Sequence, residues 1–451
     1  MKKEEFWQSK GEIKSIELRD CNEYICFFNT QANTSLTMQA IKELKDNKLD
    51  FINISTNVYK KDDVNIIDCD YIDENNIILK TSYYVGFYSK GTVNITISPR
   101  FGKTIRDYLY SYALGLYLPK SVTGSASSEH NHWLLCMLWV GSLEYALNKS
   151  NIPKNYERIK KNQKYFKGSL DISNHIKHNL VNANRFYCSY SKQTYNTPIN
   201  RAILKAYDHL LKLGFSSMLN SVSSHIQMLR DFGVGDNVRL DELKSIHYTP
   251  LNKAYQKVVS LSELIIKNQA SKSSFDNSNG FGYFLDLSEV WEGYLYKLMS
   301  KNLQGFRVVN GNFASKNYFF NGNLRELRPD FFIYKDSKLV AVLDAKYKNY
   351  SSLGKTSCDA GAVSREDLYQ MSAYMYRFNA PLGIFLSPNT DDVAMEQVAG
   401  KDSNMAILGI NLSQDENDKD NKKEKANIIK CLKEKEKDFI NKLKKILEDE
   451  K

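Results

Sequence analysis

The stretch "LRPDFFIYKDSKLVAVLDAKYK", residues 327–348, holds two apolar runs, and each run has acidic residues at one end. Residues 331–334 and 338–348 read as two strands joined by a turn at 335–337. The unbroken apolar run at 339–343 is typical of a strand that is buried on both faces. The sequence therefore predicts a hairpin in the centre of a sheet, with Asp330 opening the first strand and Asp344 near the end of the second.

Charged side chains gather at one end of this hairpin. Side chains alternate along a strand, so Val340, Val342, Asp344 and Lys346 share one face, and the hairpin brings Asp330 towards Asp344. Two neighbouring carboxylates repel each other unless a cation lies between them, and oxygen ligands suit Mg²⁺ or Mn²⁺. A lysine there can help to deprotonate a water or stabilise charge on a phosphoryl oxygen. This pattern predicts metal-assisted phosphodiester hydrolysis; the alternative is a surface hairpin with solvated charges.

A helix predicted over residues 287–303 precedes the hairpin and carries Glu292 among apolar residues. Glu292 is a candidate third metal ligand, or a group that orients a metal-bound water. Glu289 is an alternative on a nearby face, and an ordinary surface glutamate is a third interpretation.

A second helix is predicted over residues 364–378, where Ser364 and Asp367 form a start like a capping box. Gln370 and Tyr374 are four residues apart, so they project from one face. We expect Gln370 near the metal-bound water and Tyr374 against the DNA backbone, although a core tyrosine would give the same pattern.

Two lysines between the hairpin and this helix are candidate DNA contacts. Lys348 and Lys355 lie in "AKYKNYSSLGK", where lysines and tyrosines interleave. They could contact phosphates, or they could belong to a solvated loop.

The whole chain reads as α/β, or α+β overall, in four parts. Residues 1–150 are β-rich and end in helices; the clearest strands lie within 83–102, where apolar and polar residues alternate. Residues 151–270 read as a helical middle region, with a well-marked helix at 196–213. A Ser, Asn and Gly-rich linker at 268–282 precedes the hairpin region, residues 271–412.

The remainder, 413–451, is a charged tail with apolar residues at helical spacing. A solvated amphipathic helix on a flexible tether is the favoured interpretation, and a helix that docks specifically is the alternative.

Composition agrees with a folded, non-membrane protein of 451 residues. The net charge of +10 is compatible with a polyanionic partner. The seven cysteines are odd in number and form no C-x-x-C pair, which favours a reducing cytoplasm. The N-terminus lacks a signal-peptide core, and the longest apolar stretch, 133–141, is too short to cross a bilayer.

Several other motifs carry little weight. The GKT strings at 102–104 and 354–356 lack the earlier glycine of a phosphate-binding loop, so we expect no nucleotide hydrolysis by this chain alone. The histidine pairs at 130 and 132 and at 175 and 178 are weak metal candidates.

Taken together, the ordered motifs resemble the PD-(D/E)XK nuclease superfamily, and more narrowly the McrC-like nuclease subunits of McrBC-type restriction systems. The resemblance covers roughly residues 80–412. It is carried by "VWEGYL", "LRPDFFI", "VLDAKYK" and "DLYQMSAY", and more loosely by "FKGSLDISNHIKHN", "YNTPINRAILKA" and "YYVGFYSKGTVNITISPRFG".

The resemblance implies a restriction-endonuclease-like mixed sheet flanked by helices in 271–412. By motif position, Asp330, Asp344 and Glu292 would be metal ligands, Lys346 the catalytic lysine, and Gln370 and Tyr374 supporting residues. It also implies double-stranded DNA as substrate and a hexameric AAA+ GTPase like McrB as partner. The N-terminal part would dock in the pore of that partner and stimulate its hydrolysis.

The function expected from the sequence is a Mg²⁺-dependent endonuclease, the cleavage subunit of an NTP-dependent restriction or phage-defence complex. A non-cutting subunit that activates a AAA+ NTPase is the alternative.

Overall fold

The chain forms two compact units, which we describe separately. Unit 1 comprises residues 1–55, 59–118 and 278–451, and unit 2 comprises residues 56–58 and 119–277. The computed structural model describes residues 2–5, 15–28, 31–46, 50–52, 58–60, 65–90, 93–114, 127–181, 184–273, 281–311, 317–350, 352–353, 361–390, 392–413 and 422–449. The predicted boundary at residue 150 is replaced by one near residue 118, because the long helix that follows packs with the helices of unit 2.

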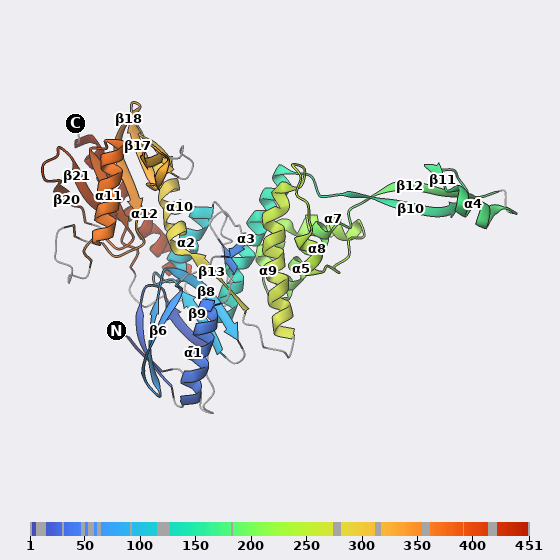
Figure 1. Cartoon of the computed structure of the whole chain (residues 1–451), viewed down its shortest axis with the longest axis horizontal. Coiled ribbons are helices and arrows are strands. Elements are labelled where there is room, and N and C mark those ends of the chain that lie inside the picture. The colour runs from blue at the N-terminus through green and yellow to red at the C-terminus, as the bar shows by residue number, and fades with distance from the viewer. Residues whose placement is uncertain are drawn as a thin grey trace. The chain divides into compact units, whose positions relative to one another are not determined.

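The N-terminal part of unit 1 is β-rich, as expected, and contains two sheets (Figure 1). The first has six strands in the order β2 (Ser15–Arg19), β9 (Val93–Ser98), β8 (Tyr84–Lys90), β13 (Phe281–Asp286), β4 (Asp50–Ile52) and β5 (Val58–Lys60). The second has the order β1 (Lys2–Glu5), β3 (Glu23–Phe27), β7 (Asn76–Thr81) and β6 (Ile67–Asp73). Helices α1 (Gln31–Asp46) and α2 (Lys103–Leu114) complete this part.

Strand β13 joins the N-terminal sheet although it comes late in the chain. It pairs antiparallel with β8 and parallel with β4. Strands β13 and β8 approach closely at two glycines. A Cβ added to Gly86 would lie 2.1 Å from the Tyr283 carbonyl oxygen, and one added to Gly282 would lie 2.3 Å from the Phe87 carbonyl oxygen. Residues 281–286, predicted as the end of a linker and the start of the C-terminal part, therefore belong to the N-terminal sheet.

The C-terminal part of unit 1 is a mixed six-stranded sheet. The strand order is β14 (Arg307–Asn310), β17 (Phe331–Lys335), β18 (Lys338–Ala345), β19 (Leu382–Ser387), β21 (Asn404–Gly409) and β20 (Ala394–Gln397). The predicted hairpin is β17–β18, and Asp336 and Ser337 both have positive φ, as a two-residue turn of the I′ type requires. Strands β18 and β19 pair in parallel, so β18 is central, as its apolar run predicted.

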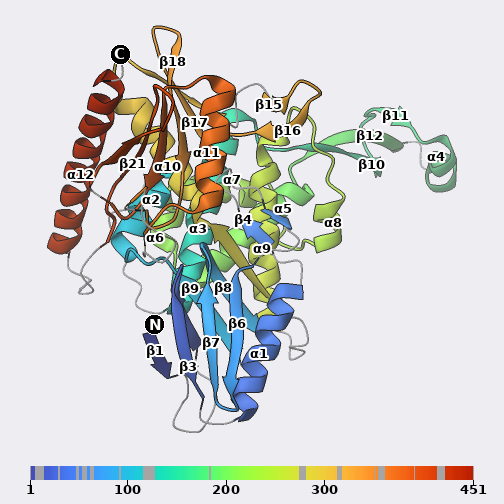
Figure 2. The same cartoon turned by 60° about the vertical axis from the view of Figure 1, so that its left-hand side comes forward.

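Helices cover both faces of this sheet, as Figure 2 shows for α11 (Arg365–Phe378) and α12 (Lys422–Asp449). Phe332 and Val342 pack towards Met371 of α11, and Gly383 of β19 allows this helix a close approach. Helix α10 (Leu287–Asn302) lies on the other face, where Trp291 Nε1 donates a hydrogen bond to the Leu386 carbonyl at 3.1 Å. A small hairpin of β15 (Asn317–Phe320) and β16 (Leu324–Leu327) precedes β17.

The C-terminal helix α12 is docked, which corrects the expectation of a solvated helix on a tether. Leu432, Phe439 and Leu443 are buried. Glu436 is also buried and accepts hydrogen bonds from Tyr108 of α2 at 2.9 Å and Tyr294 of α10 at 2.7 Å. The apolar stripe was visible in the sequence, but its partners lie on helices more than a hundred residues away.

Unit 2 combines a helical bundle with a β finger. The bundle contains α3 (Ser127–Lys149), α5 (Pro198–Lys212), α6 (Ser216–Leu219), η1 (Asn220–Val222), α7 (Ser223–Asp231), α8 (Leu240–Lys244), η2 (Lys253–Tyr255) and α9 (Gln256–Ser273). Thr197 caps α5 and Pro198 opens it, as predicted. The buried Trp139 Nε1 donates to Ser262 Oγ at 2.8 Å and ties α3 to α9.

The finger consists of β10 (Asn155–Gln163), β11 (Ser169–Leu170), α4 (Ile172–Asn179) and β12 (Phe186–Thr194). Figure 1 shows β10 and β12 as a long ribbon with β11 and α4 at its far end. The sequence was predicted to be mostly helical here. The finger strands were missed because both faces are largely exposed, so no apolar alternation marks them.

No helix among the described residues is long and apolar enough to cross a membrane. The six cysteines within the described ranges are free thiols.

Candidate active site

Asp330 and Asp344 meet at one edge of the C-terminal sheet. Strands β17 and β18 pair so that Phe331 lies opposite Leu343, which places Asp330 opposite Asp344 one residue further on. The Ala345 backbone N–H donates a hydrogen bond to Asp330 Oδ2 at 2.6 Å. The Asp344 side chain is buried, with 4 % of the residue exposed. The hairpin therefore brings the two carboxyl groups together, as the sequence predicted.

The electrostatics of Asp330 show that three acidic groups interact here. Burial raises the pKa of Asp330 well above its usual range, and the charges of Asp344 and Glu292 raise it further. The hydrogen bond from Ala345 opposes this shift only in part. Such mutual repulsion is relieved when a divalent cation lies between the carboxylates.

Glu292, rather than Glu289, is the α10 glutamate whose charge reaches Asp330. It is partly buried, and its Oε1 accepts a hydrogen bond from Asn310 Nδ2 at 3.1 Å. The predicted convergence of Glu292 with the hairpin is thus present, although its role as a ligand stays a prediction.

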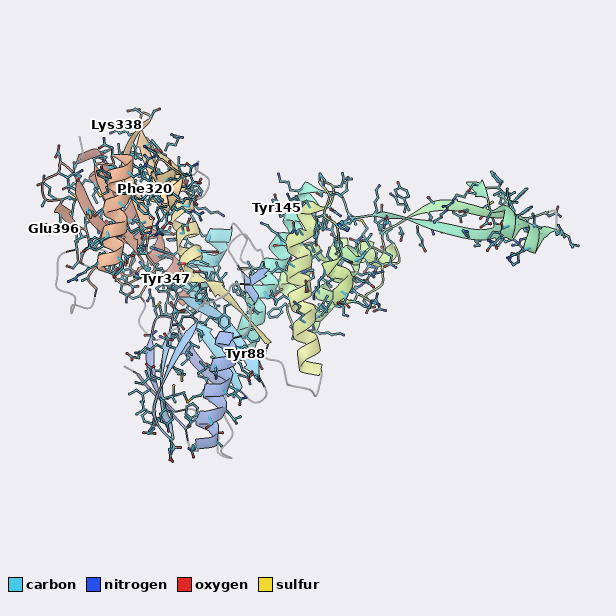
Figure 3. All side chains as sticks on the ribbon, in the orientation of Figure 1. Tyr88, Tyr145, Phe320, Lys338, Tyr347 and Glu396 are labelled. Carbon is cyan, nitrogen blue, oxygen red and sulfur yellow. The ribbon has the colours of Figure 1, made fainter. Side chains whose placement is uncertain are left out.

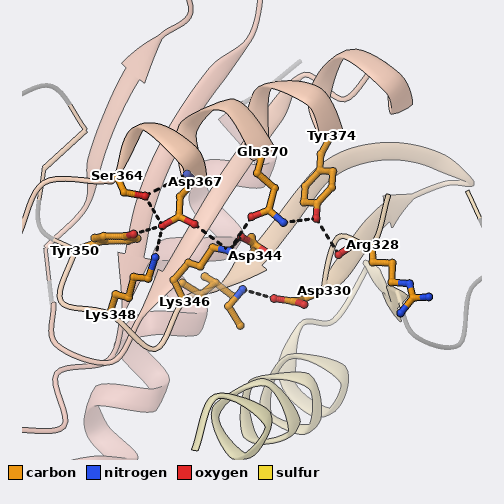
Figure 4. Close-up of polar contacts among 12 residues, drawn as sticks. Arg328, Asp330, Asp344, Lys346, Lys348, Tyr350, Ser364, Asp367, Gln370 and Tyr374 are labelled. Atoms are coloured by element: carbon orange, nitrogen blue, oxygen red, sulfur yellow. Dashed lines mark hydrogen bonds and ion pairs between the residues drawn. The ribbon is translucent and has the colours of Figure 1, made fainter. Parts of the chain in front are cut away.

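Lys346 lies on the same face as Asp344 and contacts three groups (Figure 4). Its Nζ is 2.7 Å from Asp344 Oδ2 and 3.2 Å from Asp367 Oδ1, and it donates to Gln370 Oε1 at 2.8 Å. Burial disfavours the charge on Lys346, but the two aspartates outweigh burial and raise its pKa above the ordinary lysine value. Lys346 is therefore paired with two carboxylates in this arrangement.

Gln370 and Tyr374 share one face of α11, as predicted, and continue the chain of contacts. Gln370 Nε2 donates to the Tyr374 hydroxyl at 2.7 Å, and that hydroxyl donates to the Arg328 carbonyl at 3.1 Å. Tyr374 is 3 % exposed, and burial together with the charge of Asp344 raises its pKa to about 12. The predicted DNA contact at Tyr374 is not supported, because this tyrosine is packed in the core and holds Gln370.

Asp367 is a site residue that the sequence analysis treated only as part of a helix cap. Its Oδ2 accepts from Lys348 Nζ at 2.7 Å, from Ser364 Oγ at 2.9 Å and from the Tyr350 hydroxyl. Burial alone would raise its pKa, but these hydrogen bonds and the charge of Lys346 lower it below the usual range. Its position three residues before Gln370, on the same helical face, was the available signal.

The structure describes only one of the two lysines that were predicted to contact DNA. Lys348 has an exposed side chain, but its Nζ is paired with Asp367, so a phosphate would have to share it. Lys355 and the GKT string at 354–356 lie outside the described residues.

The other weak motifs have structural explanations where the structure describes them. Gly102 precedes α2, whose Thr104 side chain is buried, so this GKT string forms the start of a helix. His175 accepts a hydrogen bond from the Tyr187 backbone N–H at 3.3 Å and stacks on Phe186. The side chains of residues 130 and 132 are outside the described part of the chain.

The acidic edge fits a cation that is held only in part by protein. Within the described ranges, no group of three or more His, Cys, Asp and Glu side chains is already arranged around a metal position. Asp344 Oδ2 is nevertheless a buried oxygen without a hydrogen bond of good geometry, despite the nearby Lys346 ammonium. Two carboxylates completed by waters and substrate oxygens are the usual protein environment of Mg²⁺.

One solved structure shares the fold of this chain, and a second is similar over part of it. A chain of the structure described as "Refined half-complex from tetradecameric assembly of Thermococcus gammatolerans McrB AAA+ hexamers with bound McrC" is similar with a TM-score of 0.58 and 16 % sequence identity, covering 96 % of this chain and 100 % of that one. The cryo-EM structure of the Thermococcus gammatolerans McrBC complex gives a TM-score of 0.37 and 17 % identity, covering 65 % and 89 %.

No curated protein matches the chain. A family model, described as McrBC 5-methylcytosine restriction system component, matches residues 79–386, which is more than half of the sequence and includes Asp330, Asp344, Lys346 and the helix that carries Gln370. The protein therefore belongs to the McrBC 5-methylcytosine restriction system component family.

Proposed function

We propose that the protein is a Mg²⁺-dependent DNA endonuclease of the PD-(D/E)XK type, the cleavage subunit of an McrBC-like restriction complex in the cytoplasm. The observation that carries this proposal is the meeting of Asp330, Asp344 and Lys346 at one sheet edge, with the charge of Glu292 acting on the same point. Family membership supports the restriction context.

The two aspartates would hold Mg²⁺, or Mn²⁺, through one oxygen or more of each. Asp344 is fixed by burial in β18, and Asp330 is oriented by the Ala345 N–H. When bound, the cation would supply Lewis acidity and lower the pKa of a coordinated water. Glu292 lies near enough to influence Asp330 and would orient that water or complete the ligand set.

Lys346 lies where it can serve either of its two predicted roles. It would help to deprotonate a water, or stabilise negative charge on the phosphoryl oxygens. Gln370 and Asp367 hold its ammonium at the site. In the reaction, water adds to phosphorus, one P–O ester bond breaks, and the leaving oxygen takes up a proton.

A AAA+ partner is the second part of the proposal. The solved complex with this fold contains McrB AAA+ hexamers with bound McrC. In this chain we assign partner docking to the finger rather than to residues 1–150. Residues 151–195 carry nine lysines and arginines against two acidic residues, and Tyr165, Leu180 and Val181 near its far end are 82 %, 79 % and 98 % exposed. Exposed apolar groups among cations suit a protein interface with an acidic surface.

The test is plasmid cleavage by the chain assembled with the AAA+ protein, in Mg²⁺ and either GTP or ATP. We expect Asp344→Ala and Lys346→Ala to abolish cutting while stimulation of partner NTP hydrolysis persists. Lys338→Ala, at the other end of β18, is the matched control and should cut normally.

Full cleavage by either site variant would contradict the nuclease assignment. If instead the wild type stimulates the partner strongly but cuts no DNA under any metal, the non-cutting activator is the better description of this subunit.

A further inference from the structure

Tyr347 follows Lys346 directly, and its side chain projects from the opposite face of the chain just after β18. Side chains alternate along an extended chain, so a residue next to Lys346 points away from α11. Tyr347 is 5 % exposed, and in Figure 3 it lies where the N-terminal strands meet the C-terminal part of unit 1. Its surroundings therefore belong to a part of the chain more than two hundred residues earlier.

Three residues of the N-terminal part, Asp20, Arg100 and Phe101, form what we call the Tyr347 socket. The Arg100 guanidinium carbon lies 4.7 Å from the centre of the Tyr347 ring, within the range of a cation–π contact. The Phe101 ring meets the Tyr347 ring edge-to-face, with centroids 5.7 Å apart and planes at 79°. The Asp20 carboxylate is fully buried, and its charge acts on the tyrosine hydroxyl.

The socket is held firmly by the backbone of the N-terminal sheets. Arg100 N donates to Asp20 Oδ1 at 2.6 Å, and Asp20 N donates to the Ser98 carbonyl at 3.0 Å. The next residue, Cys21, has a φ of 50° and donates its N–H to the Ser82 carbonyl. The turn after β2 and the loop after β9 are thus held together by hydrogen bonds, and together they contact the Tyr347 ring.

The socket contains buried polar atoms whose retention needs a reason. The Asp20 carboxylate is a hydrogen-bond partner of the Tyr347 hydroxyl and lies beside the Arg100 charge. Arg100 Nε and Nη2 are buried without a hydrogen bond of good geometry. Each such atom costs free energy that an apolar contact of similar shape would avoid. Packing alone would be served better by apolar residues, so the charged socket points to a role in orientation.

The segment that Tyr347 anchors carries the proposed catalytic lysine. Lys346 N donates to the Leu386 carbonyl at 3.0 Å, which fixes the backbone on the β19 side. The Tyr347 ring fixes the same backbone from the N-terminal side. Two adjacent residues are thus held by different parts of the fold, and the direction of the Lys346 side chain depends on both.

We propose that Tyr347 is a positioning residue through which the N-terminal part of unit 1 sets the placement of Lys346. This inference rests on the proposed nuclease function. It makes cleavage depend on Arg100 and Asp20, which contribute nothing to the acidic edge itself. A shift of a reacting group by about 1 Å can reduce a rate by roughly 100-fold.

The test uses the full chain assembled with its AAA+ partner and measures kcat and KM for DNA cleavage at saturating Mg²⁺. We expect Tyr347→Leu and Arg100→Met to lower kcat by about 10- to 100-fold with KM for DNA unchanged. Tyr347→Phe retains the ring and should restore most of kcat. Asp20→Asn should give an intermediate loss, because it removes the charge while leaving an acceptor for Arg100 N–H.

Arg106→Met is the matched control, because Arg106 is a buried arginine of unit 1 that pairs with Asp107 rather than with Tyr347. Its kcat should equal that of the wild type. Partner NTPase stimulation and the folded fraction by circular dichroism are measured for every variant, so each kcat refers to folded, assembled protein.

Wild-type kcat in folded Tyr347→Leu and Arg100→Met would overturn the positioning role while leaving the nuclease assignment intact, provided that Lys346→Ala is inactive. An equal loss in Arg106→Met would show that any buried substitution has this effect, and would overturn it too. Undiminished cleavage by Lys346→Ala would remove the proposed function and this inference with it.

Discussion

Asp367 lies three residues before Gln370 on α11, and both side chains reach Lys346. Its carboxylate also pairs with Lys348 and accepts a hydrogen bond from Tyr350. A buried carboxylate shared by two lysines stabilises both ammonium groups, and breaking such a group leaves charges buried without a partner. Asp367 is therefore central to the order of the site although it does not face the acidic edge.

We predict that Asp367→Asn lowers the free energy of unfolding by about 3 kcal/mol at pH 7. Because the folded protein lowers the pKa of Asp367, its stabilisation is complete above the ordinary aspartate pKa of about 3.9. It is lost as the pH falls through the lowered value. The difference between wild type and variant, measured by urea unfolding, should shrink below pH 4.

Glu366→Gln provides the matched control, because Glu366 is the exposed neighbour in the same helical turn. Its effect should be about 0.5 kcal/mol. Equal losses in the two variants would mean that Asp367 acts only through the helix dipole.

At the scale of single residues, the sequence identified the charged residues of the acidic edge but not all of the side chains that contact them. Asp330, Asp344 and Lys346 follow from strand alternation and one short turn, so local rules were sufficient. The burial of Tyr374, which was one of two interpretations, and the ion pairs of Asp367 could not be settled from the sequence, because both depend on how α11 packs on the sheet. The Tyr347 socket could not be predicted, since it joins residues 20, 100 and 347.

Helix α12 shows how an amphipathic element can be predicted while its position cannot. Spacing of apolar residues gave the helix, and the high charge suggested a solvated one. In the structure its apolar stripe is buried, and the Glu436 carboxylate lies between two tyrosine hydroxyls. A docked helix of this kind contributes to the stability of unit 1 as a whole.

Leu443→Ala tests this docking, because Leu443 is completely buried. We expect a loss of about 2–5 kcal/mol in the free energy of unfolding, from lost burial and the cavity that remains. Lys445→Ala, on the exposed side of the same helix, should change it by no more than about 0.5 kcal/mol. A loss no larger than that of the control would restore the picture of a solvated tail.

The strands of the finger were missed for a related reason. Residues 155–163 and 186–194 pair with each other over nine positions, but apart from Cys188 and Ser189 their side chains are exposed or only partly buried. Hydrophobic patterning reports burial, so an exposed two-stranded ribbon gives no such signal. Long helices with caps, such as α5 and α11, were placed within a residue or two because their signals are local.

At the scale of the whole molecule, the two units divide the proposed work. Unit 1 holds the acidic edge and the socket, and unit 2 holds the finger. The sequence predicted the order of the parts but put the first boundary about thirty residues too late. Single-chain patterning cannot show which neighbouring core a helix such as α3 will join.

We predict that replacing residues 156–193 by a short Gly-Ser turn abolishes stimulation of partner NTP hydrolysis. Asn155 and Thr194 pair across the base of the finger, so a turn can close the gap without disturbing the bundle. The double variant Tyr165→Ala and Phe166→Ala should weaken stimulation at least tenfold, a loss of about 1.4 kcal/mol in coupling. Thermal unfolding of the bundle should be unchanged.

Leu251→Ala is the control, because Leu251 is 83 % exposed in unit 2 but outside the finger. Normal stimulation by the finger deletion would move the docking site elsewhere, with the N-terminal part as the next candidate.

Strand β13 has a consequence for the order in which the chain folds during synthesis. It occupies an inner position of the N-terminal sheet, between β8 and β4, yet it is made after all of unit 2. That sheet lacks an inner strand during synthesis until residue 286 has left the ribosome. The helices of the bundle, in contrast, have all been synthesised by residue 273. Unit 2, which is inserted between the two main parts of unit 1, is thus ready to fold first. Unit 1, which holds the acidic edge, is completed only when the last third of the chain has been translated.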